Sequence, residues 1–111
     1  MIDLTGLWIF KLTEGIYIIQ QNGNEISIHG MGIGKNRFDN IGFGKIDEDG
    51  KIINGVWQDT PYSANPQNSV KHIFNIKIEE DYLSSSDNIF NYGKFERKYK
   101  IGDFMSFFKE F

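Results

Sequence analysis

His72 is the residue of this sequence best suited to chemistry. It lies on the apolar side of the alternating segment 70–78, which is typical of a β-strand with that side facing inward. A histidine in such a place is either a hydrogen-bonded core residue or part of a site, and both roles need a partner. Asp59, Tyr17 and Ser27 are the candidate partners. A pair of His72 and Asp59 facing a cavity would suit acid–base chemistry or the recognition of a polar ligand.

Trp57 is the second candidate site residue. If Asp49-Gly50 forms a hairpin turn, Trp57 lies opposite Gly42, where its ring would cover the strand glycine. Alternatively, the ring forms the wall of a pocket mouth, because Asp59 and the polar, proline-containing segment 61–68 follow it closely. The sequence leaves both interpretations open.

Other kinds of reaction find little support. The chain has no cysteine, which excludes disulfides, thiolate nucleophiles and cysteine-bound zinc. Its two histidines, His29 and His72, are far apart in the sequence, and no carboxylates stand at a recognised metal-binding spacing. The glycines of the segment 30–34 lack the Gly-Lys-Ser/Thr ending of a phosphate loop. We expect no catalytic residue, no metal and no cofactor, and an enzyme using His72 and Asp59 is the weakest hypothesis.

Size and charge narrow the class of protein. A chain of 111 residues with 40% hydrophobic and 15% aromatic residues can build one core, so we expect a single domain over residues 1–111. A net charge of -3 with scattered lysines and arginines argues against a nucleic-acid partner. No stretch has membrane-spanning length and the first residues do not form a secretion signal, so we expect no membrane partner. If Met1 is the native start, a cytoplasmic location follows.

The pattern of hydrophobicity predicts an all-β fold. Apolar and polar residues alternate in short runs that turn residues interrupt, which is typical of an antiparallel sandwich or barrel. The segment 79–87 is polar and is expected to be a turn. Strands are expected over 6–12, 16–21, 24–34, 38–46, 51–60, 70–78 and 89–99, the last as one strand or a pair. These strands predict an antiparallel meander barrel of about seven or eight strands.

Two turn dipeptides predict the registers of two hairpins. Asn22-Gly23 tolerates the positive φ angles of a type I′ turn, and Asp49-Gly50 is a similar signal. The resulting registers pair Ile19 with Ile26, Tyr17 with Ile28, and Ile46 with Ile53. The first of these hairpins then has one wholly apolar face.

The C-terminal residues break the alternating pattern. Phenylalanines at 104, 107, 108 and 111 follow helical spacing, and Asp103 precedes them as an N-cap. We expect a short amphipathic helix over about 103–110. Its apolar stripe needs cover, either from the barrel or from another subunit, so a homodimer is an open alternative.

Two features of the sequence, one near each end of the predicted barrel strands, resemble landmarks of a known group of barrels. Gly6-Leu7-Trp8 is similar to the Gly-x-Trp signature that opens the first strand of calycins, the lipocalins and their relatives. Arg97 stands late in the last strand region, where that group often has an arginine packed over this tryptophan. The stretch 38–61 also resembles short uncharacterised bacterial proteins with a calycin-like sequence. The resemblance implies a lipocalin-like barrel and, loosely, the binding of a small ligand.

The leading hypothesis is a non-enzymatic protein that binds small molecules. The ligand would be small and partly polar, and it would lie at the open end of the barrel against Tyr17, Trp57, Asp59 and His72. The alternative is a protein-interaction module that uses the phenylalanine-rich C-terminal helix or an exposed sheet edge.

Overall fold

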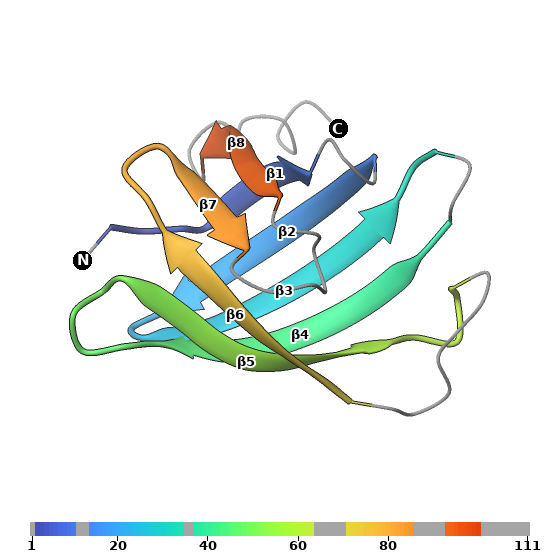
Figure 1. Ribbon diagram of the computed structural model, residues 1–111. Coiled ribbons are helices and arrows are strands. Elements are labelled where there is room, and N and C mark those ends of the chain that lie inside the picture. Colours follow the sequence, from blue (N-terminus) through green and yellow to red (C-terminus); the bar gives the residue numbers. More distant parts are fainter. Residues whose placement is uncertain (1, 11–13, 35–36, 64–70, 86–92, 101–111) are drawn as a thin grey trace.

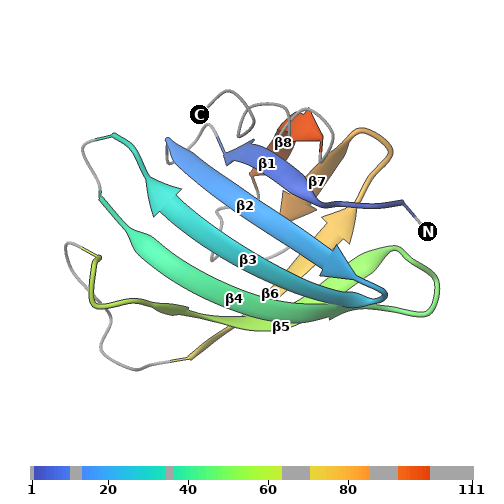
Figure 2. The same cartoon turned by 180° about the vertical axis from the view of Figure 1, so that it is seen from behind.

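Eight antiparallel strands form one closed barrel in the computed structural model, which describes residues 2–10, 14–34, 37–63, 71–85 and 93–100. Each strand pairs with the next in the sequence, and the last pairs with the first (Figures 1 and 2). The strands are β1 (Gly6–Phe10), β2 (Gly15–Asn22), β3 (Glu25–Gly32), β4 (Asp39–Ile46), β5 (Ile52–Asp59), β6 (His72–Ile78), β7 (Tyr82–Ser85) and β8 (Lys94–Lys100). The all-β meander barrel is therefore confirmed, and it agrees with a calycin-like architecture.

The core lies inside the barrel because alternate residues of each strand point inward. In β1, for example, Trp8 and Phe10 are buried, while Leu7 and Ile9, which alternate with them, are only partly buried. The buried apolar side chains are Leu4, Trp8, Phe10, Tyr17, Ile19, Ile26, Ile28, Ile46, Ile53, Phe74, Ile76, Leu83 and Phe95. The inward face predicted for β6 is confirmed at Phe74 and Ile76.

The β4–β5 hairpin has its predicted register. Ile46 lies opposite Ile53, and Trp57 lies opposite Gly42. Gly50 has a φ of 71°, and the backbone N–H of Lys51 donates to the carboxylate of Asp47 at 2.8 Å. Gly50 thus adopts the left-handed conformation in this turn, which glycine does without a steric penalty.

The register predicted for the β2–β3 hairpin is wrong by two residues. Asn22 is a strand residue opposite Glu25, and Ile19 lies opposite Ile28. Gly23 has a φ of 64°, whereas Asn24 is not among the residues with positive φ, so glycine holds the first central position as in a type II′ turn. A shift of two residues keeps every side chain on its face, so the predicted apolar face survives.

The segment 79–87 is more than the predicted turn, because it contains β7. This strand of four residues pairs with β6 and with β8, and its Leu83 is buried. With one apolar residue among polar ones, β7 depends on pairing along both edges and gives no alternating signal of its own. The predicted strand 89–99 corresponds to β8 over its second half.

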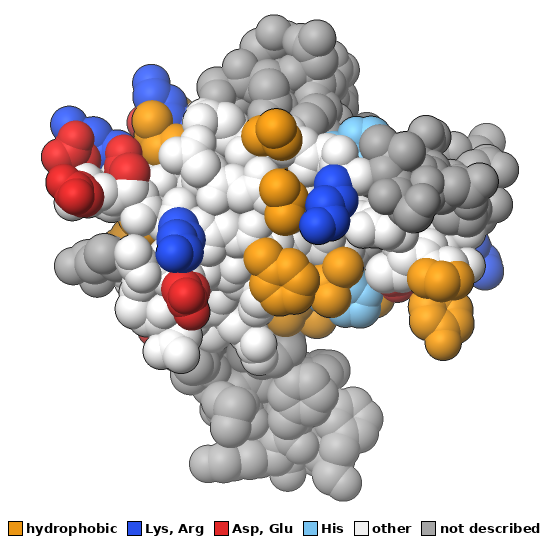
Figure 3. Space-filling model, turned by 90° about the horizontal axis from the view of Figure 1, so that it is seen from below, with side chains coloured by type: hydrophobic (Ala, Val, Ile, Leu, Met, Phe, Trp, Pro, Cys, Tyr) orange, Lys and Arg blue, Asp and Glu red, His pale blue; other side chains and the backbone are white. Residues whose placement is uncertain are grey.

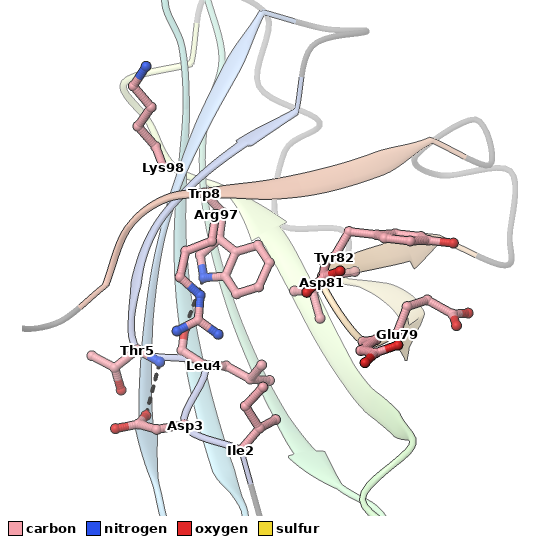
Figure 4. Close-up of a pocket in the computed structure, with 12 residues that line it drawn as sticks. Ile2, Asp3, Leu4, Thr5, Trp8, Glu79, Asp81, Tyr82, Arg97 and Lys98 are labelled. Carbon is pink, nitrogen blue, oxygen red and sulfur yellow. Dashed lines mark hydrogen bonds between the residues drawn. The ribbon is translucent and has the colours of Figure 1, made fainter.

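The pairing of β8 with β1 closes the barrel. The guanidinium of Arg97 lies 4.7 Å from the ring centroid of Trp8, and the indole N–H of Trp8 donates to the carbonyl of Leu4 at 2.9 Å (Figure 4). The predicted packing of arginine over tryptophan is confirmed. Each described strand has a paired neighbour on both sides, and β6 pairs with β7 over Ile76, Lys77 and Ile78.

Two predictions concern residues that the structure does not describe. The helix expected over 103–110 lies outside the described residues, and so does most of the loop 61–68. Within the described ranges, no helix is long and apolar enough to cross a membrane.

Candidate functional site

Strand pairing places three polar side chains in one row inside the barrel. Tyr17 lies opposite Gly30, Gly30 opposite Asn40, and Asn40 opposite Asp59. Tyr17 and Gly30 are buried, and Asn40 and Asp59 are partly buried. This row crosses β2 to β5 near the end of β5 that leads into residues 60–63.

The next inward row contains the other two predicted site residues. Gly42 lies opposite Trp57, and Trp57 lies opposite His72. The two rings stack with their centroids 4.4 Å apart and their planes 22° from parallel. Because Trp57 and Asp59 are two residues apart on one strand face, the structure brings all four predicted residues to the same end of the interior.

Tyr17 has an aromatic environment. Its ring meets Phe95 edge-on at 5.0 Å and Phe10 edge-on at 6.3 Å, and it lies 6.1 Å from the ring of Phe38. A Cβ atom on Gly30 would lie only 2.6 Å from Cε1 of Tyr17. The ring therefore lies directly over the glycine backbone, and Tyr17 forms the apolar floor of this end.

The predicted hydrogen-bond partners of His72 are wrong for its Nε2 atom. This nitrogen is buried, and none of the described residues forms a hydrogen bond with it. Ser27 lines a hollow on the outer face of the sheet, and neither Asp59 nor Tyr17 bonds to this nitrogen. A buried polar atom left unpaired costs about 1–3 kcal/mol, so Nε2 of His72 is an atom that a ligand can satisfy.

Two residues at this end of the barrel interior were not predicted from the sequence. Asn40 occupies the inward row between Gly30 and Asp59, and Phe38 packs against the core. The predicted strand 38–46 contained both residues, but its alternation around Gly42 and Gly44 is weak because glycine carries no side chain. Gly30 was the available signal, since a glycine within a strand often marks a place where another group approaches the backbone closely.

The other histidine is on the opposite side of the sheet wall. His29 is exposed, and its Nε2 lies 3.2 Å from a carboxylate oxygen of Asp39. Thr60 donates to the same carboxylate at 2.6 Å, and the hydroxyl of Ser63 donates to the carbonyl of Asp39, also at 2.6 Å. These bonds fasten the start of the segment after β5 to the beginning of β4.

A hollow of about 700 Å³ opens where the barrel closes. Figure 4 shows Arg97 and Trp8 on one side of it, and Glu79, Asp81 and Tyr82 on the other. None of the four predicted site residues lines this hollow. Because the guanidinium of Arg97 already stacks on the indole, we assign the hollow to barrel closure.

Metal binding and relationships to other proteins give no further indication. Among the described residues, no group of three or more histidines, aspartates or glutamates could hold a metal ion. Comparison with protein-family models, with curated proteins and with solved structures finds no match to this chain.

Proposed function

We propose that this protein binds a small, partly polar molecule inside the barrel. The molecule would lie at the end of the barrel interior that contains Tyr17, Trp57, Asp59 and His72. The observation that carries the proposal is the buried Nε2 of His72, which none of the described residues satisfies while the ring is stacked on Trp57. A closed β-barrel is an architecture compatible with ligand binding.

The side chains at this end suit a ligand with one flat apolar part and one polar part. Trp57 and His72 form an aromatic wall, and Tyr17 adds a second aromatic surface backed by Phe95. Nε2 of His72 can donate or accept one hydrogen bond, and the carboxylate of Asp59 accepts. Few polar groups on apolar walls are the usual composition of a small-molecule site.

Native mass spectrometry of the freshly purified full-length chain tests this proposal. We expect a mass adduct on the native protein that disappears under denaturing conditions. In the variant His72→Phe, a ring is kept for stacking on Trp57 but both imidazole nitrogens are lost, so the adduct should be lost. The matched control is His29→Phe, which removes the only other histidine, from the outer face, and should keep the adduct.

Thermal unfolding of each variant establishes that it is folded before its spectrum is compared. Two results would contradict the proposal. One is an adduct of equal abundance in the wild type and in folded His72→Phe. The other is a native wild-type spectrum that shows the bare chain mass alone.

A further inference from the structure

The sequence contains two Asn-Gly pairs, and the fold holds them very differently. Asn22-Gly23 stands where β2 ends and the turn to β3 begins, whereas Asn54-Gly55 lies inside β5. Both asparagine residues are exposed to solvent. Exposure therefore does not distinguish the two pairs, and the difference lies in what holds their backbones.

The difference matters because an Asn-Gly pair can lose its side-chain amide without an enzyme. The backbone nitrogen of the glycine attacks Cγ of the asparagine, so that a new C–N bond forms and the bond from Cγ to Nδ2 breaks. The side-chain nitrogen leaves as ammonia and takes up the proton of the glycine N–H. Water then opens the cyclic imide at either of its two carbonyl carbons, which leaves an aspartate or an isoaspartate. Glycine favours the attack because it has no side chain that keeps the reacting atoms apart.

The extended backbone of a strand opposes this ring closure. The ring closes only when Cβ of the asparagine and the next backbone nitrogen are nearly eclipsed, which is far from the ψ of about +135° of an antiparallel strand. The asparagine must therefore leave its strand conformation first. The rate of the reaction in a folded protein then depends on the free energy of this local opening.

Asn54 is held along both edges of its strand. It lies opposite Lys45 of β4 and opposite Asn75 of β6, and the side-chain amide of Asn75 donates to its Oδ1. The next residue is covered as well, since a Cβ atom on Gly55 would lie 2.6 Å from Cζ of Phe74. Figure 3 shows the outer side of this part of the barrel wall, where hydrophobic side chains gather. Opening at Asn54 would have to break strand pairing inside the wall.

Asn22 is held along one edge only. Its partner is Glu25, which forms the last pair before the turn, and the pairing of β2 with β1 ends at Ile19 (Figure 2). The side chain of Asn22 forms no hydrogen bond with any residue that the structure describes. Apart from the chain neighbours, nothing lies within 4 Å of the place that a Cβ atom on Gly23 would take. Opening at Asn22 therefore costs only the pair at the end of the hairpin.

We propose that Asn22 is a site of spontaneous deamidation in the folded protein and that the fold protects Asn54 from the same reaction. The reaction adds one negative charge to a net charge of -3. The new carboxylate stands opposite Glu25, and two like charges in one cross-strand pair destabilise it. An isoaspartate also lengthens the backbone by one atom, so the last pair of the hairpin loses its register. The modification thus loosens the β2–β3 turn.

Peptide mapping by mass spectrometry of the full-length chain, incubated at neutral pH, measures both sites at once. We expect deamidation at Asn22 to be at least about tenfold faster than at Asn54, because a tenfold ratio needs an opening cost higher by about 1.4 kcal/mol, the size of one or two ladder hydrogen bonds.

The same chain unfolded in urea is the control, because neither pair is then held and the two rates should converge. Three results would overturn the proposal. The first is a ratio of rates that is the same in native buffer and in urea, since the sequence alone would then set it. The second is an Asn54 that reacts as fast as Asn22 in the folded protein. The third is an unmodified Asn22 in the folded protein after the urea-unfolded chain has reacted at both sites.

Ion-exchange chromatography of two variants tests the assignment independently. Asn22→Gln keeps a side-chain amide but would have to close a larger ring, so the acidic species that forms on storage should no longer accumulate. Asn54→Gln is the matched control and should leave its accumulation unchanged. Thermal unfolding establishes that both variants are folded. Equal accumulation of the acidic species in the two folded variants would rule out Asn22 as its source.

Discussion

At the scale of single residues, the position of His72 follows from the strand face that it shares with Phe74. Alternation along β6 was enough to predict that the imidazole points inward. Its hydrogen bonding could not be predicted, because the partner of a buried side chain is set by strands far away in the sequence. Its stacking on Trp57 arises from the β5–β6 register, for which the sequence has no turn signal.

Gly30→Ala should destabilise the protein through overpacking. The new Cβ would lie 2.6 Å from Cε1 of Tyr17, and that ring is held by Phe10 and Phe95. We expect the free energy of unfolding to fall by about 1–3 kcal/mol. Urea denaturation followed by fluorescence measures it, and an unchanged midpoint would show that Tyr17 does not pack on this glycine.

Asp3 should make a small, pH-dependent contribution to stability. The backbone N–H of Thr5 donates to its carboxylate at 3.0 Å, and this bond, together with the Thr5 hydroxyl and more weakly Arg97, lowers the pKa of Asp3 (Figure 4). A lowered pKa in the folded state gives stability that is present above the unfolded pKa and is lost as the pH falls through the folded pKa.

The variant Asp3→Asn keeps an acceptor for the Thr5 N–H but has no charge. Its deficit relative to the wild type should be about 0.5 kcal/mol or less at neutral pH, because solvent screens an exposed carboxylate, and it should vanish in acid. Denaturation midpoints of both proteins across the acid range test this sign. A deficit that grows as the pH falls would be inconsistent with it.

At the scale of elements, the two hairpins show what turn residues can specify. Asp49-Gly50 led to the correct β4–β5 register, since Gly50 adopts the left-handed conformation that its position suggested. The β2–β3 register failed because Asn22-Gly23 can be placed in a two-residue loop in more than one way, and glycine takes the first central position here. The short strand β7 was missed since Leu83 is its only buried apolar residue.

The corrected β2–β3 turn can be tested with one pair of substitutions. Gly23→Ala should cost about 1–2 kcal/mol, because the residue has a φ of 64° that a side chain disfavours, although space around it is open. Asn22→Val should change stability by about 0.5 kcal/mol or less, since Asn22 is a strand residue where valine is accepted. If Asn22→Val is as costly as Gly23→Ala, residue 22 belongs to the turn and the observed register is wrong. Chemical denaturation gives both values.

At the scale of the whole molecule, the barrel depends on a contact between its first and last strands. Composition and alternation predicted the meander, but closure joins β1 to β8 across almost the whole chain. The pairing of Trp8 with Arg97 was anticipated only through the calycin resemblance. The outward apolar side chains Phe43, Val56 and Ile73 were not anticipated as neighbours, because they come from three strands and become neighbours only when the registers are known.

Arg97→Gln should weaken closure. The variant removes a guanidinium that lies 4.7 Å from the Trp8 ring centroid, and we expect a loss of about 0.5–2 kcal/mol of unfolding free energy. Lys98→Gln is the matched control, because Lys98 is the adjacent residue, is exposed, and carries the same charge. Its substitution should change stability by about 0.5 kcal/mol or less. Equal effects of the two variants would show that the charge, rather than the stacking, matters.

The central claim is that the inner end beside His72 and Trp57 holds a ligand, and a high-resolution crystal structure of the freshly purified protein tests it most directly. The proposal predicts continuous non-protein density, larger than a water molecule, within hydrogen-bonding distance of Nε2 of His72. A protein group bonded to that nitrogen, or a single water molecule and nothing more, would contradict it. In that case His72 would be a satisfied core residue and this end of the barrel would serve packing alone.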